Sequence, residues 1–368
     1  MWHLAAVVGL TASVSCAGLG TDLVVKSAPK ATVASTTVAP PLPRCVSTLS
    51  VEQKVGQMLM PLVENPTGLA PLVAAGQIGG FALIGDPPGE IGALISTLQA
   101  SSPLPLMVAS DEEGGSVQRL KAVLGPLPSA QVQASTDLPD TVIERYRSYS
   151  SRMKEMGVGM NFGPVLDIGP GSGIGDRAWG ADLATVSTYG KAVIQGTISG
   201  GVVPVAKHWP GLGTGQVDPH KGRTQLAGID ELRAADLTVF REAISGGLPA
   251  IMVSHGTIPG LTNDVPASIS REAITNELRG NQGFTGLVVT DSMGMGAITD
   301  TMAEADAIVL AAVAGADLIL VSDPSVIPGA LVRLVAAVQA GSFPTAQLDA
   351  SVDRFLEIKG RGATCGPA

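Results

Sequence analysis

Residues 203–211 read Val-Pro-Val-Ala-Lys-His-Trp-Pro-Gly, so a short apolar run stops abruptly at a lysine, a histidine and a tryptophan. A buried strand has little reason to end in Lys207-His208 unless a site lies above its carboxyl end. A glycine-rich loop follows, and Asp218-Pro219-His220 comes soon after it. Two of the chain's four histidines lie in this segment, which is the first indication of chemistry.

Outward from this stretch, eight short runs rich in Val, Ile, Leu and Met are candidate strands. They are Met58–Leu62, Gly79–Ile84, Leu104–Ala109, Met160–Pro164, Val202–Ala206, Ala250–Ser254, Leu287–Thr290 and Leu318–Val321. Segments with helical spacing separate them, the clearest being Asp140–Met156, Thr185–Ser199, Glu231–Ile244, Ala303–Ala314 and Ser325–Ala340. This alternation predicts an α/β fold, a (β/α)₈ TIM-type barrel forming a single catalytic domain. A doubly wound open sheet is the alternative, because counting strands does not prove closure.

Polar residues follow the predicted strands at regular places, as a barrel with its site at the carboxyl ends requires. In chain order they are Asp111, Asp167, Lys207-His208, His255, Asp291 and Asp323. The composition agrees with parallel strands covered by helices, since 45% of the 368 residues are hydrophobic and only 3% are aromatic. The net charge of −9 argues against nucleic acid or an anionic membrane surface as the main partner.

The N-terminus is interpreted as a targeting segment. Residues 4–14 form an apolar run of signal-peptide length, too short to span a bilayer. The small residues before Cys16 resemble a lipobox, so we expect residues 1–16 to be a signal segment and Cys16 to be lipidated, with plain secretion as the alternative. Residues 17–44, rich in Ala, Thr and Pro, are expected to form a disordered tether. The barrel would then be residues 45–368 of an exported protein that contacts a membrane only through its lipid.

The two remaining cysteines, Cys45 and Cys365, lie near the ends of the predicted domain. In an exported protein a disulfide between them is the economical interpretation, and two free thiols are the alternative.

Asp291 follows the apolar run of residues 286–290 and precedes two close glycines. A carboxylate there can attack a sugar C1 and form a glycosyl ester; the alternative is a helix N-cap. Asp218 and His220 lie in a glycine-containing loop over residues 211–222. A carboxylate beside an imidazole favours the imidazolium and gives an acid–base group, although a solvated loop pair would look the same.

Further binding residues are expected near the same strand ends. Of the three acids in Asp111-Glu112-Glu113, one is expected to bind sugar hydroxyls and the other two to cap or face solvent, with Arg119 close by. Arg177 offers planar donors, unless Asp176-Arg177 is only a structural pair. His255 is either a ligand or a satisfied core histidine.

Together these pieces resemble family 3 glycoside hydrolases, in particular single-domain bacterial β-N-acetylglucosaminidases and their actinobacterial lipoprotein members. The family motifs match Asp111–Arg119, Phe162–Asp167, Gly175–Gly180, Lys207–Gly213, Asp218–His220 and Thr290–Ala297. The resemblance implies a (β/α)₈ barrel, Asp291 as nucleophile and His220 as acid/base assisted by Asp218. The residues expected to bind the sugar are Asp111, Arg119, Arg177, Lys207, His208 and His255.

Three positions depart from the family pattern. Leu212 replaces the second histidine of the Lys-His motif, Pro219 replaces a serine, and Ser116 replaces a frequent arginine. The separation of His208 and His220 (220 − 208 = 12) is kept, so we expect an active enzyme.

We therefore expect a retaining exo-β-N-acetylglucosaminidase that acts as a monomer, without metal or cofactor, on GlcNAc–MurNAc fragments of peptidoglycan. The alternatives are a β-glucosidase-type specificity and a weakened family 3 relative that serves as a sugar-binding lipoprotein. A metal-dependent barrel hydrolase usually needs a close His-x-His ligand pair, and the sequence has none.

Overall fold

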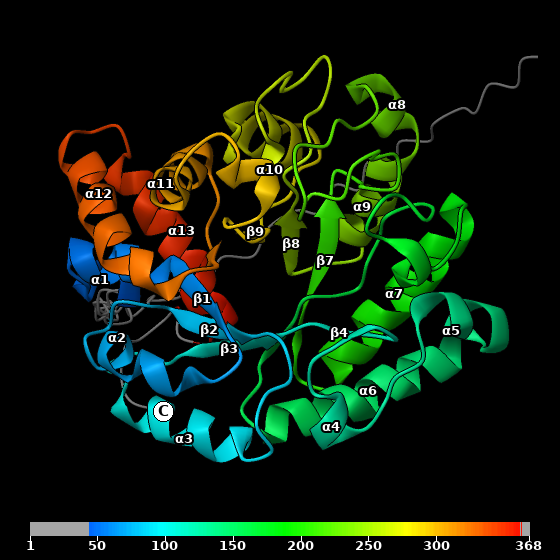
Figure 1. The fold of residues 1–368 in the computed structure, drawn as a ribbon, viewed down its shortest axis with the longest axis horizontal. Helices are drawn as coiled ribbons and strands as arrows, with labels where there is room; N and C mark the ends of the chain where they lie inside the picture. Colours follow the sequence, from blue (N-terminus) through cyan, green and yellow to red (C-terminus); the bar gives the residue numbers. More distant parts are fainter. Residues whose placement is uncertain (1–43, 361, 363–368) are drawn as a thin grey trace, which may run out of the picture. The chain divides into compact units, whose positions relative to one another are not determined.

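The computed structural model describes residues 44–360 and residue 362, and here eight parallel strands form one sheet (Figure 1). They are β1 (Leu59–Val63), β2 (Gly80–Leu83), β3 (Met107–Ser110), β6 (Met160–Asn161), β7 (Val203–Trp209), β8 (Ala250–Val253), β9 (Leu287–Thr290) and β10 (Ile319–Val321). Their order is β10-β1-β2-β3-β6-β7-β8-β9. The ends of this row also meet: Val289 forms a parallel bridge with Leu318, and the Thr290 N–H donates to the Leu318 carbonyl at 3.0 Å. The sheet is thus a nearly closed barrel, and the open-sheet alternative is wrong.

All eight predicted strands are present, with shifted ends. Strand β7 is longer than expected, because after a register shift between Ala206 and Trp209 it pairs with β8 again, Trp209 with Val253. Lys207 and His208 therefore lie in the irregular last part of the strand and not in a free loop, and a parallel bridge between Val165 and Lys207 helps to hold the backbone there.

Helices surround the strands (Figure 1). They are α1 (Val51–Gln57), α2 (Ala70–Ala74), α3 (Ile91–Ser101), α4 (Lys121–Leu124), α5 (Ala130–Thr136), α6 (Pro139–Glu155), α7 (Leu183–Ser199), α8 (Ile229–Ala234), α9 (Asp236–Ser245), α10 (Gly296–Thr299), α11 (Glu304–Ala314), α12 (Ile327–Gln339), α13 (Thr345–Ile358) and a π-helix, Glu272–Asn281. Four of the five predicted helices are confirmed. The fifth, Glu231–Ile244, is wrong as one helix: it breaks at Ala235 (φ −124°, ψ −90°), and the break accompanies the burial of Asp236.

The hydrophobic core has two parts, one on each face of the barrel wall. The inner part fills the barrel with side chains such as Met60, Met160, Val205 and Leu287. The outer part packs strands against helices. Each strand is therefore buried on both faces, which is why the strands read as continuous apolar runs and not as alternating ones.

The two ends of the described domain lie together. Arg44 pairs with Asp353 at 3.0 Å and with Glu357, both on α13. Cys45 is disulfide-bonded and buried, and its N–H faces the Gly362 carbonyl at 3.4 Å. Cys365, Cys16, the signal segment and nearly all of the tether lie outside the described residues, so these predictions and the domain division stay predictions. Within residues 44–360 and 362, no helix combines the length and apolar character needed to cross a bilayer.

Candidate active site

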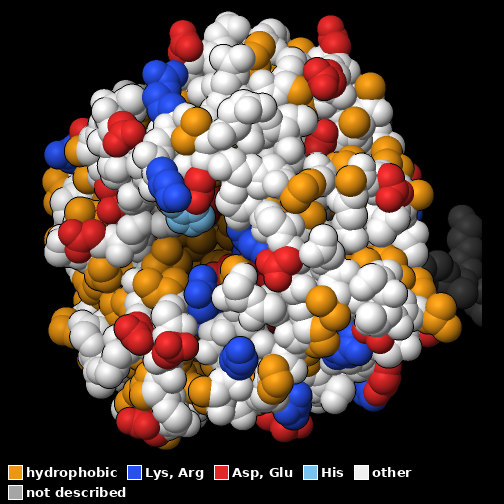
Figure 2. Space-filling view, turned by 45° about the vertical axis from the view of Figure 1, so that its right-hand side comes forward, with side chains coloured by type: hydrophobic (Ala, Val, Ile, Leu, Met, Phe, Trp, Pro, Cys, Tyr) orange, Lys and Arg blue, Asp and Glu red, His pale blue; other side chains and the backbone are white. Residues whose placement is uncertain are grey.

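A pocket of about 400 Å³ opens at the carboxyl ends of the strands. On the surface it is a hollow in which a histidine, basic and acidic side chains surround an apolar floor (Figure 2). Its lining is Leu62, Ile84, Asp111, Glu113, Val117, Arg119, Phe162, Arg177, Lys207, His208, His220, Met252, Asp291, Ser292, Gly294, Met295, Leu320 and Ser322. Eight of the nine residues predicted for catalysis or binding are in or beside this pocket; Asp218 reaches it through His220, and only His255 is turned away.

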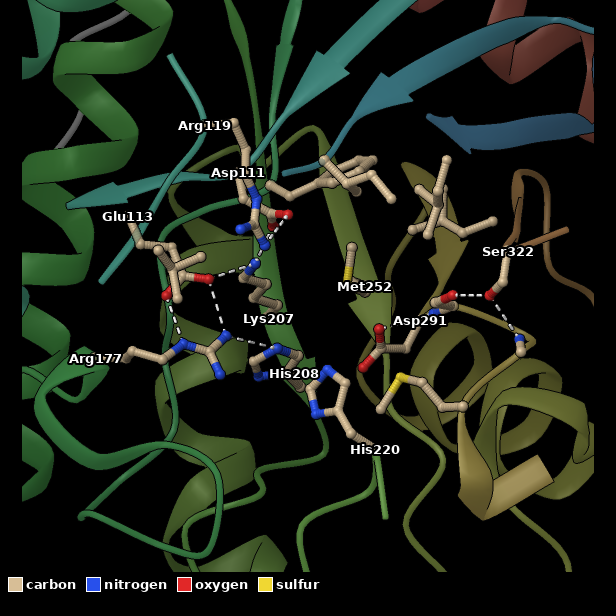
Figure 3. Close-up of a pocket in the computed structure, with 18 residues that line it drawn as sticks. Asp111, Glu113, Arg119, Arg177, Lys207, His208, His220, Met252, Asp291 and Ser322 are labelled. Atoms are coloured by element: carbon tan, nitrogen blue, oxygen red, sulfur yellow. Dashed lines mark hydrogen bonds and ion pairs between the residues drawn. The ribbon is translucent and has the colours of Figure 1, made fainter. Parts of the chain in front are cut away.

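One wall of the pocket is a network of paired charges (Figure 3). The Lys207 ammonium contacts Asp111 Oδ1 and Glu113 Oε1, both at 2.6 Å. The Arg177 guanidinium donates to both oxygens of Glu113, from Nε at 2.7 Å and from Nη2 at 2.9 Å. Arg119 lies farther out, with Nη2 at 3.5 Å from Asp111 Oδ2. These planar and charged groups are fixed before any ligand arrives, as hydrogen bonding to sugar hydroxyls requires.

The charges of this wall stabilise one another. Burial alone would raise the pKa of Asp111 and of Glu113, but the Lys207 ammonium lowers both, with help from arginines. Burial would likewise lower the pKa of Lys207, and Asp111 and Glu113 raise it. All three groups are therefore ionised in the folded protein.

His208 has a fixed orientation. Its Nδ1 lies 2.7 Å from Asp167 Oδ2, and Arg177 Nη2 lies 3.4 Å from its Nε2. Since Asp167 accepts from Nδ1–H, Nε2 is left to accept from the guanidinium. Asp167 also accepts the Leu212 N–H at 2.6 Å, so Leu212, where the motif has a histidine, supports the site through its backbone.

Asp291 follows β9 and faces the pocket (Figure 3). Its Oδ1 accepts the N–H of Ser292 at 2.8 Å. Burial works to raise the pKa of Asp291, but the neighbouring His208 and Lys207 side chains and this N–H lower it overall. The next helix, α10, begins at Gly296 with Met295 at its cap position, so the N-cap alternative for Asp291 is wrong. What remains is an ionised carboxylate at the pocket wall.

Asp218 and His220 form a dyad across from Asp291. His220 Nδ1 and N both lie near Asp218 Oδ1, at 2.7 and 3.0 Å. Burial works to raise the pKa of Asp218, and the hydrogen bonds from His220 lower it overall. The His220 side chain is 66% exposed, so solvent and ligands can reach it.

Backbone contacts tie the dyad to the segment that carries Asp291. The N–H of Ala297 donates to the Pro219 carbonyl at 3.1 Å, and that of Gly296 faces the His220 carbonyl at 3.4 Å. Pro219 therefore takes part through its backbone carbonyl, as Leu212 does through its backbone N–H, and this role does not need the serine of the family motif. The acid/base candidate and the nucleophile candidate are held on one local framework.

His255 does not line the pocket. Its ring is buried, with Nδ1 at 2.7 Å from Ser268 Oγ and Nε2 at 2.8 Å from the Ser292 carbonyl. Burial lowers the pKa of His255, so the ring is neutral. It lies behind the Asp291–Ser292 turn as a satisfied core histidine.

The expectation for the acidic run was wrong in part. Glu112 and Glu113 are both buried, not solvent-facing. Glu113 is a pocket residue that the sequence did not single out, and Arg177 pairs with it and not with Asp176. Glu112 points into the core, where it accepts from Ser110 Oγ at 2.5 Å and from Tyr149 Oη at 2.7 Å.

Two other acids lie outside the pocket, Asp323 after β10 and Asp236 at the start of α9. Asp323 is a turn cap that accepts the Ser325 N–H at 2.9 Å. Asp236, missed from sequence, is buried near Asp167, and burial with the Asp167 charge raises the pKa of Asp236 to about 6. As for metals, the described residues contain no group of three or more His, Cys, Asp or Glu side chains placed to hold an ion.

The glycosyl hydrolase family 3 N-terminal domain matches residues 50–358. The chain belongs to glycoside hydrolase family 3. This family 3 enzyme is 36% identical over 351 residues to the β-hexosaminidase LpqI of Mycobacterium tuberculosis, covering 90% of each chain. Its fold matches the crystal structure of a family 3 glycosyl hydrolase from Mycobacterium smegmatis with a TM-score of 0.82 at 34% identity, over 88% of this chain and 99% of that one. It also matches a family 3 β-N-acetylglucosaminidase from a Paenibacillus species, with a TM-score of 0.81 at 32% identity, over 87% and 64% of the chains. The protein is thus a glycoside hydrolase with a TIM-type barrel, as the sequence predicted.

Proposed function

We propose that this hydrolase is a retaining exo-β-N-acetylglucosaminidase that removes terminal β-linked GlcNAc. The observation that carries the proposal is that an ionised Asp291 and His220, which is paired with Asp218, line one pocket, and that backbone hydrogen bonds join the segment after Asp291 to the loop of the dyad. A nucleophile and a separate acid–base group on one sugar site are the two parts that a double displacement needs.

In the first step, an oxygen of Asp291 attacks C1 and the bond from C1 to the leaving oxygen breaks. Nδ1–H of His220 faces Asp218, so the imidazolium gives its Nε2 proton to that oxygen. In the second step the neutral ring takes a proton from water, the water oxygen bonds to C1, and the Asp291 carboxylate leaves. Two inversions at C1 give retention.

The paired charges on the opposite wall would bind the sugar. Asp111 and Glu113 are acceptors, and Lys207 and Arg177 are donors, so ring hydroxyls meet both kinds of group. The other wall is apolar and includes Met252, Met295 and Leu320, which suits the acetamido methyl. A volume of about 400 Å³ is small for a ligand pocket and supports an exo enzyme that holds one terminal sugar.

The β-hexosaminidase and β-N-acetylglucosaminidase names of the relatives support GlcNAc over glucose. Peptidoglycan fragments with a GlcNAc–MurNAc linkage are our proposed natural substrates. An exported enzyme, anchored by lipid at Cys16 or secreted, would meet them outside the cytoplasmic membrane.

Release of nitrophenol from the aryl β-N-acetylglucosaminide and from the aryl β-glucoside tests the proposal, with Asp291→Ala as control. We expect turnover of the first substrate, much weaker turnover of the second, and loss of both in the variant. Preferred hydrolysis of the glucoside would favour a β-glucosidase. Full activity of Asp291→Ala would remove Asp291 from the mechanism.

A further inference from the structure

A second hollow of about 550 Å³ adjoins the active-site pocket. The two share Val117, Arg177 and His220 as a common wall. The rest of the second hollow is lined by Ser116, Asp218 and the segment 170–175. Because His220 faces both spaces, a sugar bound in the first has its leaving group directed toward the second.

The far wall of this hollow is a glycine-rich loop held close to the dyad. The Ser172 N–H donates to the Gly215 carbonyl at 3.2 Å, and Arg177 Nη1 donates to the Gly173 carbonyl at 2.9 Å. Gly173 has φ +86°, and a Cβ there would lie 3.0 Å from Asp218 Cγ. The loop is therefore held by hydrogen bonds to Gly215 and Arg177, and the missing side chain at Gly173 lets it lie close against Asp218, which makes the hollow a formed site.

The charges around the hollow disfavour an anion. Its charged lining residues, among those described, are Arg177, Asp218 and His220. The guanidinium of Arg177 is already occupied by Glu113 and by the Gly173 carbonyl. Asp218 presents a negative charge that is paired with the acid/base histidine, and Lys221, which does not line the hollow, also acts on it. Among the lining residues, a carboxylate entering this space would meet the anion Asp218 and no cation without a partner, so its lost hydration would not be replaced.

We propose that this hollow is the leaving-group subsite and that it selects an uncharged sugar, with Ser116 at its rim setting that preference. The inference rests on the proposed function and adds the chemistry of the leaving group to it. Ser116 is exposed and lines only this second hollow, so a neutral hydroxyl stands where a basic side chain would reach an anionic ligand. Within the proposed substrates, a MurNAc whose lactyl group is amide-linked to peptide fits, and a free lactyl carboxylate does not.

The test compares kcat/KM for two disaccharides, GlcNAc–GlcNAc and GlcNAc–MurNAc with a free lactyl carboxylate, at neutral pH and low salt. The wild-type enzyme is expected to favour the uncharged disaccharide by about tenfold. Ser116→Arg should reduce that ratio by about fivefold, and high salt should weaken the effect. Ser116→Gln, long but neutral, is the matched control and should keep the wild-type ratio; Ser116→Lys repeats the charge with a different shape.

Each result is the ratio of the kcat/KM values of one variant for the two disaccharides. A smaller fraction of folded protein lowers both values equally, so it does not change the ratio. Equal kcat/KM values in the wild type, or the same ratio in Ser116→Arg, Ser116→Lys and Ser116→Gln, would overturn the inference. If the wild type cleaves the aryl N-acetylglucosaminide while showing no such selectivity, only the subsite assignment fails. If it cleaves neither aryl nor disaccharide substrates, the proposed function fails with it.

Discussion

The ring of His220 is held by Asp218 through Nδ1 and is otherwise largely exposed. We expect His220→Ala to lower kcat/KM for a GlcNAc disaccharide by about 10²–10⁴-fold, the usual contribution of a positioned acid. With a dinitrophenyl β-N-acetylglucosaminide, the rate constant of the first step should decrease far less in His220→Ala, because that leaving group needs no proton. Burst kinetics with both substrates measure the difference. Equal losses on the two would assign His220 a role other than proton transfer.

Glu112 is a second acid whose ionisation matters, this time for stability. Burial raises the pKa of Glu112 from 4.5 to about 7, against hydrogen bonds from Ser110, Tyr149 and the Leu120 N–H. A folded-state pKa above the unfolded one means that the folded protein binds the proton more tightly. The resulting stability is complete below pH 4.5 and disappears as the pH rises through about 7.

We therefore expect wild type to lose stability relative to Glu112→Gln between pH 5 and pH 8, by an amount on the order of 3 kcal/mol. Glutamine has nearly the same shape as glutamate and cannot ionise, so the free energy of unfolding of Glu112→Gln lacks the pH dependence that Glu112 causes. Urea unfolding of both proteins across that pH range measures it. A constant stability difference would show that Glu112 does not titrate there.

At the scale of elements, the start of α10 couples the two halves of the catalytic pair. A Cβ on Gly296 would lie 3.0 Å from the Gly222 backbone N and 3.1 Å from the His220 carbonyl. We expect Gly296→Ala to displace the dyad loop and lower kcat/KM for the disaccharide by about tenfold or more. Steady-state kinetics and a circular dichroism melt of the variant are the measurements.

Gly329, on the outer helix α12, is the matched control, because a Cβ there meets nothing within 4 Å. Gly329→Ala should leave activity unchanged and stabilise the helix by about 0.5–1 kcal/mol. If both variants behave alike, contact between α10 and the dyad loop is not important for catalysis.

The elements themselves were largely predictable. The apolar runs gave the eight strands, because strands buried on both faces need continuous hydrophobic sequence. The break at Ala235 was not predictable, because the sequence on both sides of it keeps helical spacing. Only the burial of Asp236 in the folded protein shows why two helices form here and not one.

The site was predictable to the extent that strand ends converge in a barrel. This geometry brought Asp111, Lys207, His208 and Asp291 together. It does not say which way each side chain points. Neighbouring residues at a strand end point in different directions, so one of them can enter the pocket while the next is buried in the wall. His255 and Glu113 were misjudged for that reason: one turns to Ser268, and the other turns toward Lys207.

At the scale of the whole molecule, the described ends meet where Cys45 is disulfide-bonded. We expect non-reducing peptide mapping to find the Cys45–Cys365 bridge. Replacing Cys45 by Ser should lower the free energy of unfolding by about 5–6 kcal/mol in the chain-entropy model. A Cys365 that reacts with a thiol reagent in the native, unreduced protein would contradict this pairing.

We propose that Asp291 forms a covalent bond with the sugar during turnover. The most direct measurement is to stall the enzyme with an activated 5-fluoro-N-acetylglucosaminyl substrate and locate the label by peptide mass spectrometry, with Asp291→Ala as the unlabelled control. We predict one sugar per enzyme, attached as an ester to Asp291. A sugar attached to a different side chain, or a label that persists in Asp291→Ala, would contradict the account.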